Sequence, residues 1–280
     1  MGIDPDVAVI LADHDARITA QDARIAALEQ GAPPEPPDPG TDPPPEGGTD
    51  MTEVTEPMRW TGAPGDQLLG LHFHDLGADT TALSIEGDGW EVGNLLLETI
   101  CLGIFWADSP NGWLHDVDVY GFGRGGAGSS GQAHAVYARD GRLTRVRVHS
   151  ADPSIPNDSA AFHAHQENGP VGPLLWEACE NHSGQGTIIA GYVRVEDVEV
   201  AGFVQSSGKF RIGVADVDNG QILLRGLDLA TLQLDGTSFG AGSVIAGHAA
   251  EVVTAGGPGL TLEQVQDRYP ELDLSGLTIG

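Results

Sequence analysis

The sequence has little positive charge. Thirteen lysine and arginine residues stand against 41 aspartate and glutamate residues, which gives a formal net charge of −28 at pH 7. A chain this acidic repels phosphate backbones and anionic lipid headgroups. We therefore expect neither nucleic acid nor a membrane surface among its partners.

Cysteines and long apolar runs are also scarce. Cys101 and Cys179 are the only cysteines and lie in apolar stretches, which excludes a disulfide scaffold and a four-cysteine zinc site and predicts two buried thiols. No run reaches eighteen apolar residues, and no basic segment followed by a long apolar one precedes the rest of the chain. Neither a membrane span nor a signal peptide for export is expected.

Residues 1–30 show a heptad pattern. The apolar seam positions are Val7, Leu11, Ile18, Ile25 and Leu28, with polar His14 and Gln21 between them. So narrow a seam is typical of a short coiled coil. The stretch from Arg24 to Glu29, RIAALE, resembles the R-h-x-x-h-E pattern of short trimeric coiled coils, with Arg24 and Glu29 flanking the seam. We therefore expect a homotrimer; the alternative is a lone amphipathic helix, which would be marginally stable in water.

Residues 31–57 are expected to be a proline-rich acidic linker. The first part, GAPPEPPDPGTDPPPEGGTD, contains no apolar residue larger than alanine or proline and cannot form a core. Such a composition favours a semi-rigid, extended spacer. A proline-rich ligand for an SH3-type domain is the alternative, but the basic flank that is usual in such ligands is missing.

Residues 58–258 repeat a pattern of short strands and glycine turns. The stretch HDVDVYGF at 115–122 returns as EDVEVAGF at 196–203, and turn dipeptides such as Asn111-Gly112 and Asp140-Gly141 precede alternating apolar residues. Units of about 22 to 30 residues without helix are typical of a β-solenoid, whereas leucine-rich repeats would need a regular leucine motif and a jelly roll would not repeat so evenly. The pattern resembles the right-handed parallel β-helix of pectate lyases, which implies an all-β fold.

Residues 259–280 depart from the repeat. Thr261 is a candidate helix N-cap, and Gln264 stands three residues further on, as in a capping box. We expect a short helix that caps the last coil and blocks edge-to-edge growth of the sheet.

Alternation with a period of two assigns the outward side chains. Val117 and Val119 are expected to point into the core, and Asp116 and Asp118 to point out. Stacking the coils in one register predicts two outward columns: Asp116, Arg145, Trp176 and Asp197 in the first, and Asp118, Arg147, Ala178, Glu199 and Asp228 in the second.

Acidic, basic and aromatic side chains on one face suit a sugar-binding or sugar-cleaving groove. The binding candidates are Trp176, as a stacking platform, with Arg145, Arg147, Asp116 and Asp118. The catalytic candidates for glycosidic cleavage or elimination are the carboxylates of Asp116, Asp118, Asp197 and Glu199. The alternative is purely structural, because stacked strands bring opposite charges together in cross-strand ion pairs.

The sequence predicts no metal and no cofactor. His163, His165 and Glu167 alternate in FHAHQEN, but a further zinc ligand is not identifiable. The acidic turn at 216–220 lacks the full spacing of a calcium loop, and the glycine-rich stretch 121–132 lacks the lysine of a phosphate-binding loop.

The order of coiled coil, proline-rich linker and β-solenoid resembles the tail fibres, tail spikes and head fibres of bacteriophages. The resemblance implies a homotrimer on the phage particle. Its N-terminus would attach to other virion proteins, and its β-helix would bind a polysaccharide of the host surface. Two alternatives stay open: a polysaccharide depolymerase, either a glycoside hydrolase or a lyase, on the same β-helix, and a secreted adhesin.

Overall fold

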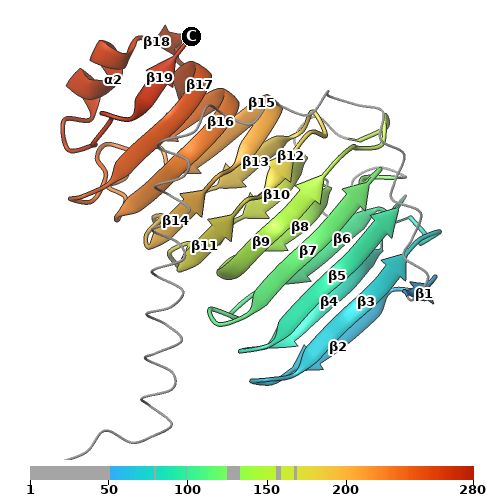
Figure 1. The fold of residues 1–280 in the computed structure, drawn as a ribbon. Helices are drawn as coiled ribbons and strands as arrows, with labels where there is room; N and C mark the ends of the chain where they lie inside the picture. Colours follow the sequence, from blue (N-terminus) through green and yellow to red (C-terminus); the bar gives the residue numbers. More distant parts are fainter. Residues whose placement is uncertain (1–50, 79, 99, 125–132, 156–158, 167–168) are drawn as a thin grey trace, which may run out of the picture. The chain divides into compact units, whose positions relative to one another are not determined.

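The computed structural model describes residues 51–280, apart from residues 79, 99, 125–132, 156–158 and 167–168 (Figure 1). The expected coiled coil at 1–30 and most of the expected linker lie outside the described residues. The same holds for the seam and its flanks: Val7, Leu11, Ile18, Arg24, Ile25, Leu28 and Glu29. Trimerisation through them stays a prediction.

The described part is a parallel β-solenoid of about eight turns. Strands pair in parallel with the equivalent strands of the coils before and after them, so that the coils stack along one direction (Figure 1). The all-β solenoid prediction is therefore confirmed. Very little helix is present in the described residues, and none of it is long and apolar enough to cross a membrane.

Each coil has three faces, which we call A, B and C. Faces A and B are the first and second halves of bent strands, and face C lies between one bent strand and the next. Faces A and B contain β3 (Gln67–Phe73), β5 (Glu91–Glu98), β7 (Trp113–Tyr120), β9 (Gly141–Val148), β11 (Leu174–Glu177), β12 (Glu180–Asn181) and β14 (Val198–Ala201).

Face C and the ends of the solenoid complete the element list. Face C contains β2 (Met58–Gly62), β4 (Thr81–Gly87), β6 (Leu102–Trp106), β8 (His134–Ala138), β10 (Ala160–Ala164) and β13 (Gly186–Ile189). Three long strands continue from face B onto face C: β15 (Val204–Gly213), β16 (Ile222–Asp235) and β17 (Val244–Thr254). At the start, β1 (Thr52–Val54) pairs with the second half of β3 and thus belongs to face B.

A residue in the left-handed backbone conformation marks the bend between faces A and B. Successive coils place Gly70, Asn94, Asp116, Arg145, Ala178, Gly202 and Gly226 there, with φ between 49° and 72°. The bend changes the spacing of inward side chains from two to three, so that Leu114 and Val117 are both buried. Glycine adopts this conformation freely, and asparagine and aspartate tolerate it, whereas most other residues do so at a cost of about 1–2 kcal/mol.

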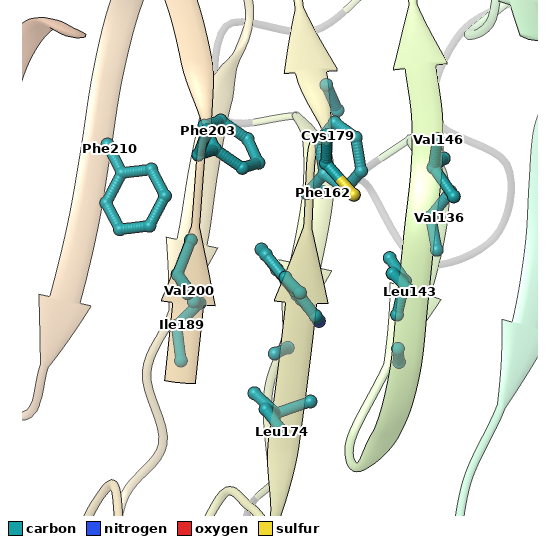
Figure 2. Close-up of a cluster of buried hydrophobic side chains, with 14 of the residues drawn as sticks. Val136, Leu143, Val146, Phe162, Leu174, Cys179, Ile189, Val200, Phe203 and Phe210 are labelled. Carbon is teal, nitrogen blue, oxygen red and sulfur yellow. The ribbon is translucent and has the colours of Figure 1, made fainter. Parts of the chain in front are cut away.

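Inward side chains stack from coil to coil in one apolar core (Figure 2). The rings of Phe162, Phe203 and Phe210 follow one another at centroid distances of 5.3 and 5.0 Å in edge-to-face geometry, which aromatic pairs favour. Cys179 lies in the same cluster, and both it and Cys101 are buried and outside any disulfide, as predicted. Burial raises the pKa of the Cys179 thiol to about 12, so this group is an unreactive packing residue.

The C-terminal segment covers the last coil. Strands β18 (Gly259–Leu260) and β19 (Leu277–Ile279) both pair with β17. Helix α2 (Leu262–Arg268) begins after Thr261, whose side chain forms a complete capping box with Gln264, so the predicted N-cap is confirmed. Val265 and Tyr269 of this segment are buried. It thereby occupies backbone groups of β17 that would otherwise form an open sheet edge.

Candidate functional site

Faces A and B carry most of the polar side chains that the sequence singled out. Asp116 and Arg145 occupy the bend position of adjacent coils, and Asp118 and Arg147 are register partners on face B. All four side chains reach the surface, with 16–49% of each exposed. Their outward placement is the predicted one, and their roles stay hypotheses.

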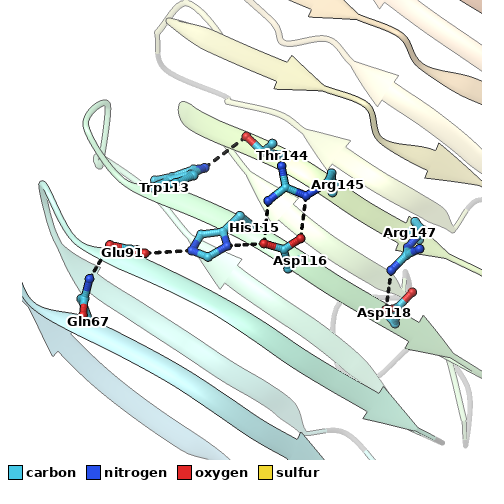
Figure 3. A network of polar contacts seen from close by, with 9 residues as sticks. All are labelled: Gln67, Glu91, Trp113, His115, Asp116, Asp118, Thr144, Arg145 and Arg147. Atoms are coloured by element: carbon cyan, nitrogen blue, oxygen red, sulfur yellow. Dashed lines mark hydrogen bonds and ion pairs between the residues drawn. The ribbon is translucent and has the colours of Figure 1, made fainter. Parts of the chain in front are cut away.

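Asp116 is the centre of a polar network (Figure 3). Arg145 donates Nε–H and Nη2–H to its two oxygens at 2.6 and 2.7 Å. His115 contacts the same carboxylate through Nδ1 at 2.7 Å and Glu91 through Nε2 at 3.0 Å, and Gln67 donates to Glu91 at 2.6 Å. The bonds from Arg145, with a smaller effect from His115, lower the pKa of Asp116 to about 2 despite partial burial. A carboxyl group with this pKa is ionised at neutral pH and is unsuited to act as a general acid.

Asp118 is enclosed by two basic side chains. Arg147 donates Nη2–H to one carboxylate oxygen at 2.9 Å, and Nε2 of His149 lies 2.7 Å from the other. The His149 ring in turn stacks on Tyr120, with centroids 4.2 Å apart and planes inclined by 2°. These contacts favour the structural interpretation of Asp118 as one member of a cross-coil ion pair.

Beyond the long coil at 153–173, the two predicted columns are wrong except for Asp228, which lies in the Asp118 row of face B as predicted. Trp176 is 1% exposed and is the register partner of Leu143 in the core. The residue that follows Arg145 at the bend is Ala178, and the residue that follows Arg147 on face B is Glu180. The long loop of this coil prevents the register of the following strand from being read from the sequence. The left-handed bend residue also interrupts the alternation with a period of two, so residues on its two sides are assigned to the wrong face when the alternation is continued across it. Trp176 is therefore no stacking platform.

An open groove of about 520 Å³ lies on face A. Asp197 and Glu199 line it, so they do not share a column with Asp116 or Asp118 as predicted. Arg225 contacts Glu199 at 3.4 Å. The outward row that lines this face A groove consists of successive register partners, which are Trp113, Arg142, Leu175, Glu199 and Leu223. Residues that directly precede β7, β11, β14 and β16 line it as well.

Trp113 and Arg142 are held in place by their neighbours. The guanidinium carbon of Arg142 lies 5.0 Å from the centroid of the Trp113 ring, within the range of a cation–π contact. Arg142 also donates Nε–H and Nη2–H to Glu177 at 3.1 and 2.6 Å. The indole N–H of Trp113 donates to the Thr144 hydroxyl at 3.1 Å (Figure 3). An aromatic ring and a cation are thus positioned in the groove without a ligand.

The histidine alternation at 163–165 contains a buried histidine that packs against a histidine of the neighbouring coil. His163 is 7% exposed on β10, and its Nδ1 lies 3.2 Å from both ring nitrogens of His134. Burial, and to a smaller degree the positive potential of His134, lowers the pKa of His163 to about 3, so the ring is neutral at physiological pH. Glu167, the third member of the alternation, lies outside the described residues.

Sequence reasoning missed Trp113 and Arg142 as candidates. Each directly follows a turn glycine, Gly112 or Gly141, after which the sequence pattern predicts a strand. The position after the turn is therefore the signal that could have found them, because these turns and the strand starts after them line the groove in successive coils.

No protein family model, curated protein or solved structure matches the chain. The resemblance to bacteriophage fibres accordingly rests on the order of the segments, of which the structure describes the solenoid. Any function has to be inferred from the geometry of the described residues.

Proposed function

We propose that this chain is a fibre or spike protein of a bacteriophage particle and that its face A groove binds a polysaccharide of the host surface. The observation that carries the proposal is the groove, in which Trp113, Leu175 and Leu223 alternate with charged Arg142 and Glu199. A sugar offers apolar C–H faces and hydroxyl groups at once, so it suits a surface of this mixed kind.

The direction of the row fits a polymer. Trp113 and Leu223 are separated by four coil-to-coil steps of about 4.8 Å, which makes the row roughly 19 Å long. A chain of several sugar units that lay across the coils would contact apolar and charged side chains in turn. Because the groove is open, it can accept the middle of a long chain as well as its end.

The pairing of the carboxylates supports binding rather than cleavage. Asp116, Asp118 and Glu199 each contact an arginine, at distances between 2.6 and 3.4 Å. Cleavage of a glycosidic bond requires one carboxyl group that is protonated near neutral pH, and a neighbouring guanidinium opposes that protonation. Asp197 and Glu199 in the groove remain the residues on which a depolymerase would depend.

The placement on a virion rests on the order of the segments. A trimeric coiled coil at 1–30 would supply the attachment to other virion proteins, and the linker would separate it from the solenoid. Binding by three copies would raise the avidity for a repetitive polymer. The acidic composition keeps such a protein soluble and limits its adhesion to nucleic acid.

Co-sedimentation with a panel of bacterial surface polysaccharides tests the proposal. For a polysaccharide that the full chain binds, Trp113→Ala and Arg142→Ala should each weaken binding by about tenfold or more, as expected for aromatic and arginine anchors. Phe105→Ala is the matched control, because it removes a partly exposed ring from face C. Equal binding by all three variants would show that the polysaccharide does not bind in the face A groove.

The same incubations distinguish binding from cleavage when the length of the polymer is followed by size-exclusion chromatography. Unchanged length during binding is the expected result. Shortening by the wild-type protein that disappears in Asp197→Asn or Glu199→Gln would identify a depolymerase instead.

A further inference from the structure

A separate cluster of metal-ligand side chains lies on face B of the first coils. Glu53 on β1 is the register partner of His72 on β3. His74 follows two residues later on the same outward side, since Leu71 and Phe73 are buried between and beside the two histidines. This His-x-His alternation differs from the one at 163–165 because the preceding coil adds a carboxylate to it.

Both imidazole rings converge on one oxygen atom. Nδ1 of His72 lies 3.0 Å from Oε2 of Glu53, and Nε2 of His74 lies 2.8 Å from the same atom. One ligand atom from each residue can be chosen so that all three lie within 4.8 Å of one another. Ligand atoms of a tetrahedral site with bonds of about 2.0–2.2 Å stand roughly 3.3–3.6 Å apart, so a small movement of side chains would admit an ion.

The other nitrogen of each ring faces a second carboxylate. Nε2 of His72 lies 2.6 Å from Glu98, and Nδ1 of His74 lies 3.0 Å from Asp75. A neutral imidazole has one N–H and one lone pair, so it can donate to only one of two carboxylates. Histidines that bind metals regularly donate their remaining N–H to a carboxylate, which fixes the ring and its tautomer. Donation to Glu98 and Asp75 would leave both lone pairs directed at the Glu53 side.

We propose that Glu53, His72 and His74 bind a divalent first-row transition metal ion such as Zn²⁺. Two imidazoles and a carboxylate suit this class of ion, whereas Mg²⁺ and Ca²⁺ prefer oxygen ligands alone. The side chain of Glu53 is 61% exposed, so a fourth position is open to water or to another ligand. The ion would fasten the three-residue strand β1 to β3 and thereby close the first coil.

Isothermal titration of the EDTA-treated full chain with ZnCl₂ at neutral pH tests the proposal, with MgCl₂ as the comparison ion. The wild-type protein is expected to bind one Zn²⁺ per chain at this site, and His72→Gln and His74→Gln should each weaken that binding by about 100-fold or more. His248→Gln is the matched control and should leave it unchanged. His248 lies in the same outward row of face B, but its partner is the Thr278 hydroxyl at 3.2 Å.

Two further measurements guard against variants that fail to fold. Co²⁺ bound by the wild-type protein should give the visible absorption of a site with nitrogen and oxygen ligands. Glu98→Gln, which keeps all three ligands, should weaken Zn²⁺ binding by about 10–100-fold. Absence of Zn²⁺ binding by the wild-type protein would overturn the proposal and leave both rings as hydrogen-bond partners of the carboxylates. Equal Zn²⁺ binding by the wild-type protein, His72→Gln and His74→Gln would overturn it as well.

Discussion

Arg145 reaches from the left-handed bend of one coil to Asp116 at the same bend of the preceding coil, and two hydrogen bonds of 2.6 and 2.7 Å join them. Neither residue is a glycine, so each bend has a conformational cost, which is larger for arginine than for aspartate. The pair is 42–49% exposed, which limits its own contribution to less than about 1 kcal/mol. Burial of Leu114 and Val117 on either side of the bend must therefore supply most of the compensation.

Asp116→Asn should make the fold less sensitive to acid. The native pKa of Asp116, about 2, lies below the unfolded value of about 3.9. The ionised carboxylate therefore stabilises the native state above about pH 4, and this contribution is lost as the pH falls toward 2. Asn94 occupies the preceding bend, so asparagine fits the backbone. Urea unfolding at about pH 7 and pH 3 should show a smaller loss of stability in the variant, and an equal loss in both proteins would contradict the assignment.

Gly202→Ala should isolate the cost of the left-handed bend. Gly202 has φ of 66°, and an added Cβ atom would come no closer than 3.9 Å to Ala178, so no steric clash contributes. We expect a destabilisation of about 1 kcal/mol in urea unfolding. Ala178→Gly is the reverse control and should stabilise the protein by a similar amount, because it reverses both the backbone strain and the change in the entropy of the unfolded chain. Two changes of the same sign would refute a purely backbone origin.

Trp176→Ala should destabilise the core without a specific effect on the proposed ligand. Deletion of a buried aromatic side chain leaves a cavity and costs about 3–5 kcal/mol, whereas Trp176→Phe should cost less. Polysaccharide binding per folded molecule should stay unchanged in Trp176→Phe and should fall in Trp113→Ala. Calorimetric unfolding together with co-sedimentation checks both expectations.

Removal of residues 259–280 should cause self-association. Strand β17 would lose its pairing with β18 and β19 and would present unpaired backbone groups to other molecules. Light scattering of the truncated protein should show particles larger than those of the full chain. Thr261→Ala is the milder comparison, because it removes the helix cap at a cost of about 1 kcal/mol while keeping both strands. A truncated protein of unchanged size would contradict the protective role of this segment.

Removal of residues 1–30 should abolish trimers if the heptad pattern forms the coiled coil that the sequence predicts. Analytical ultracentrifugation of the full and shortened chains measures this directly. Trimers that survive the deletion would move the assembly interface to the remainder of the chain.

Local patterns predicted the local features of the fold. The alternation around Val117 and Val119 gave the correct inward positions, and the Thr261–Gln264 pair gave the correct helix start. The adjacency of Asp118 and Arg147 followed from the same pattern, because neither of these two coils has a long insertion between face A and face B. In each case a few neighbouring residues contain the whole signal.

The features that sequence reasoning did not predict depend on the bend conformation and on the register between coils, which the sequence of a single strand does not contain. Trp176 was misplaced because a left-handed residue, here an alanine at 178, reverses the alternation, and alanine gives no sign of that conformation in sequence. The face A groove is formed by turns from coils whose lengths differ, so its lining could be assembled only from the register. The same is true of Glu53 and His72, which are distant in sequence but paired in space.

The row of bends also defines the unit by which this gene can change in length. Seven successive coils make the same turn with one residue, although the loops on either side differ in length from coil to coil. A duplication or deletion that begins and ends at equivalent bends would therefore preserve the pairing of the flanking coils. Recombination at these points could exchange one wall of the groove for another while the remaining coils keep their register.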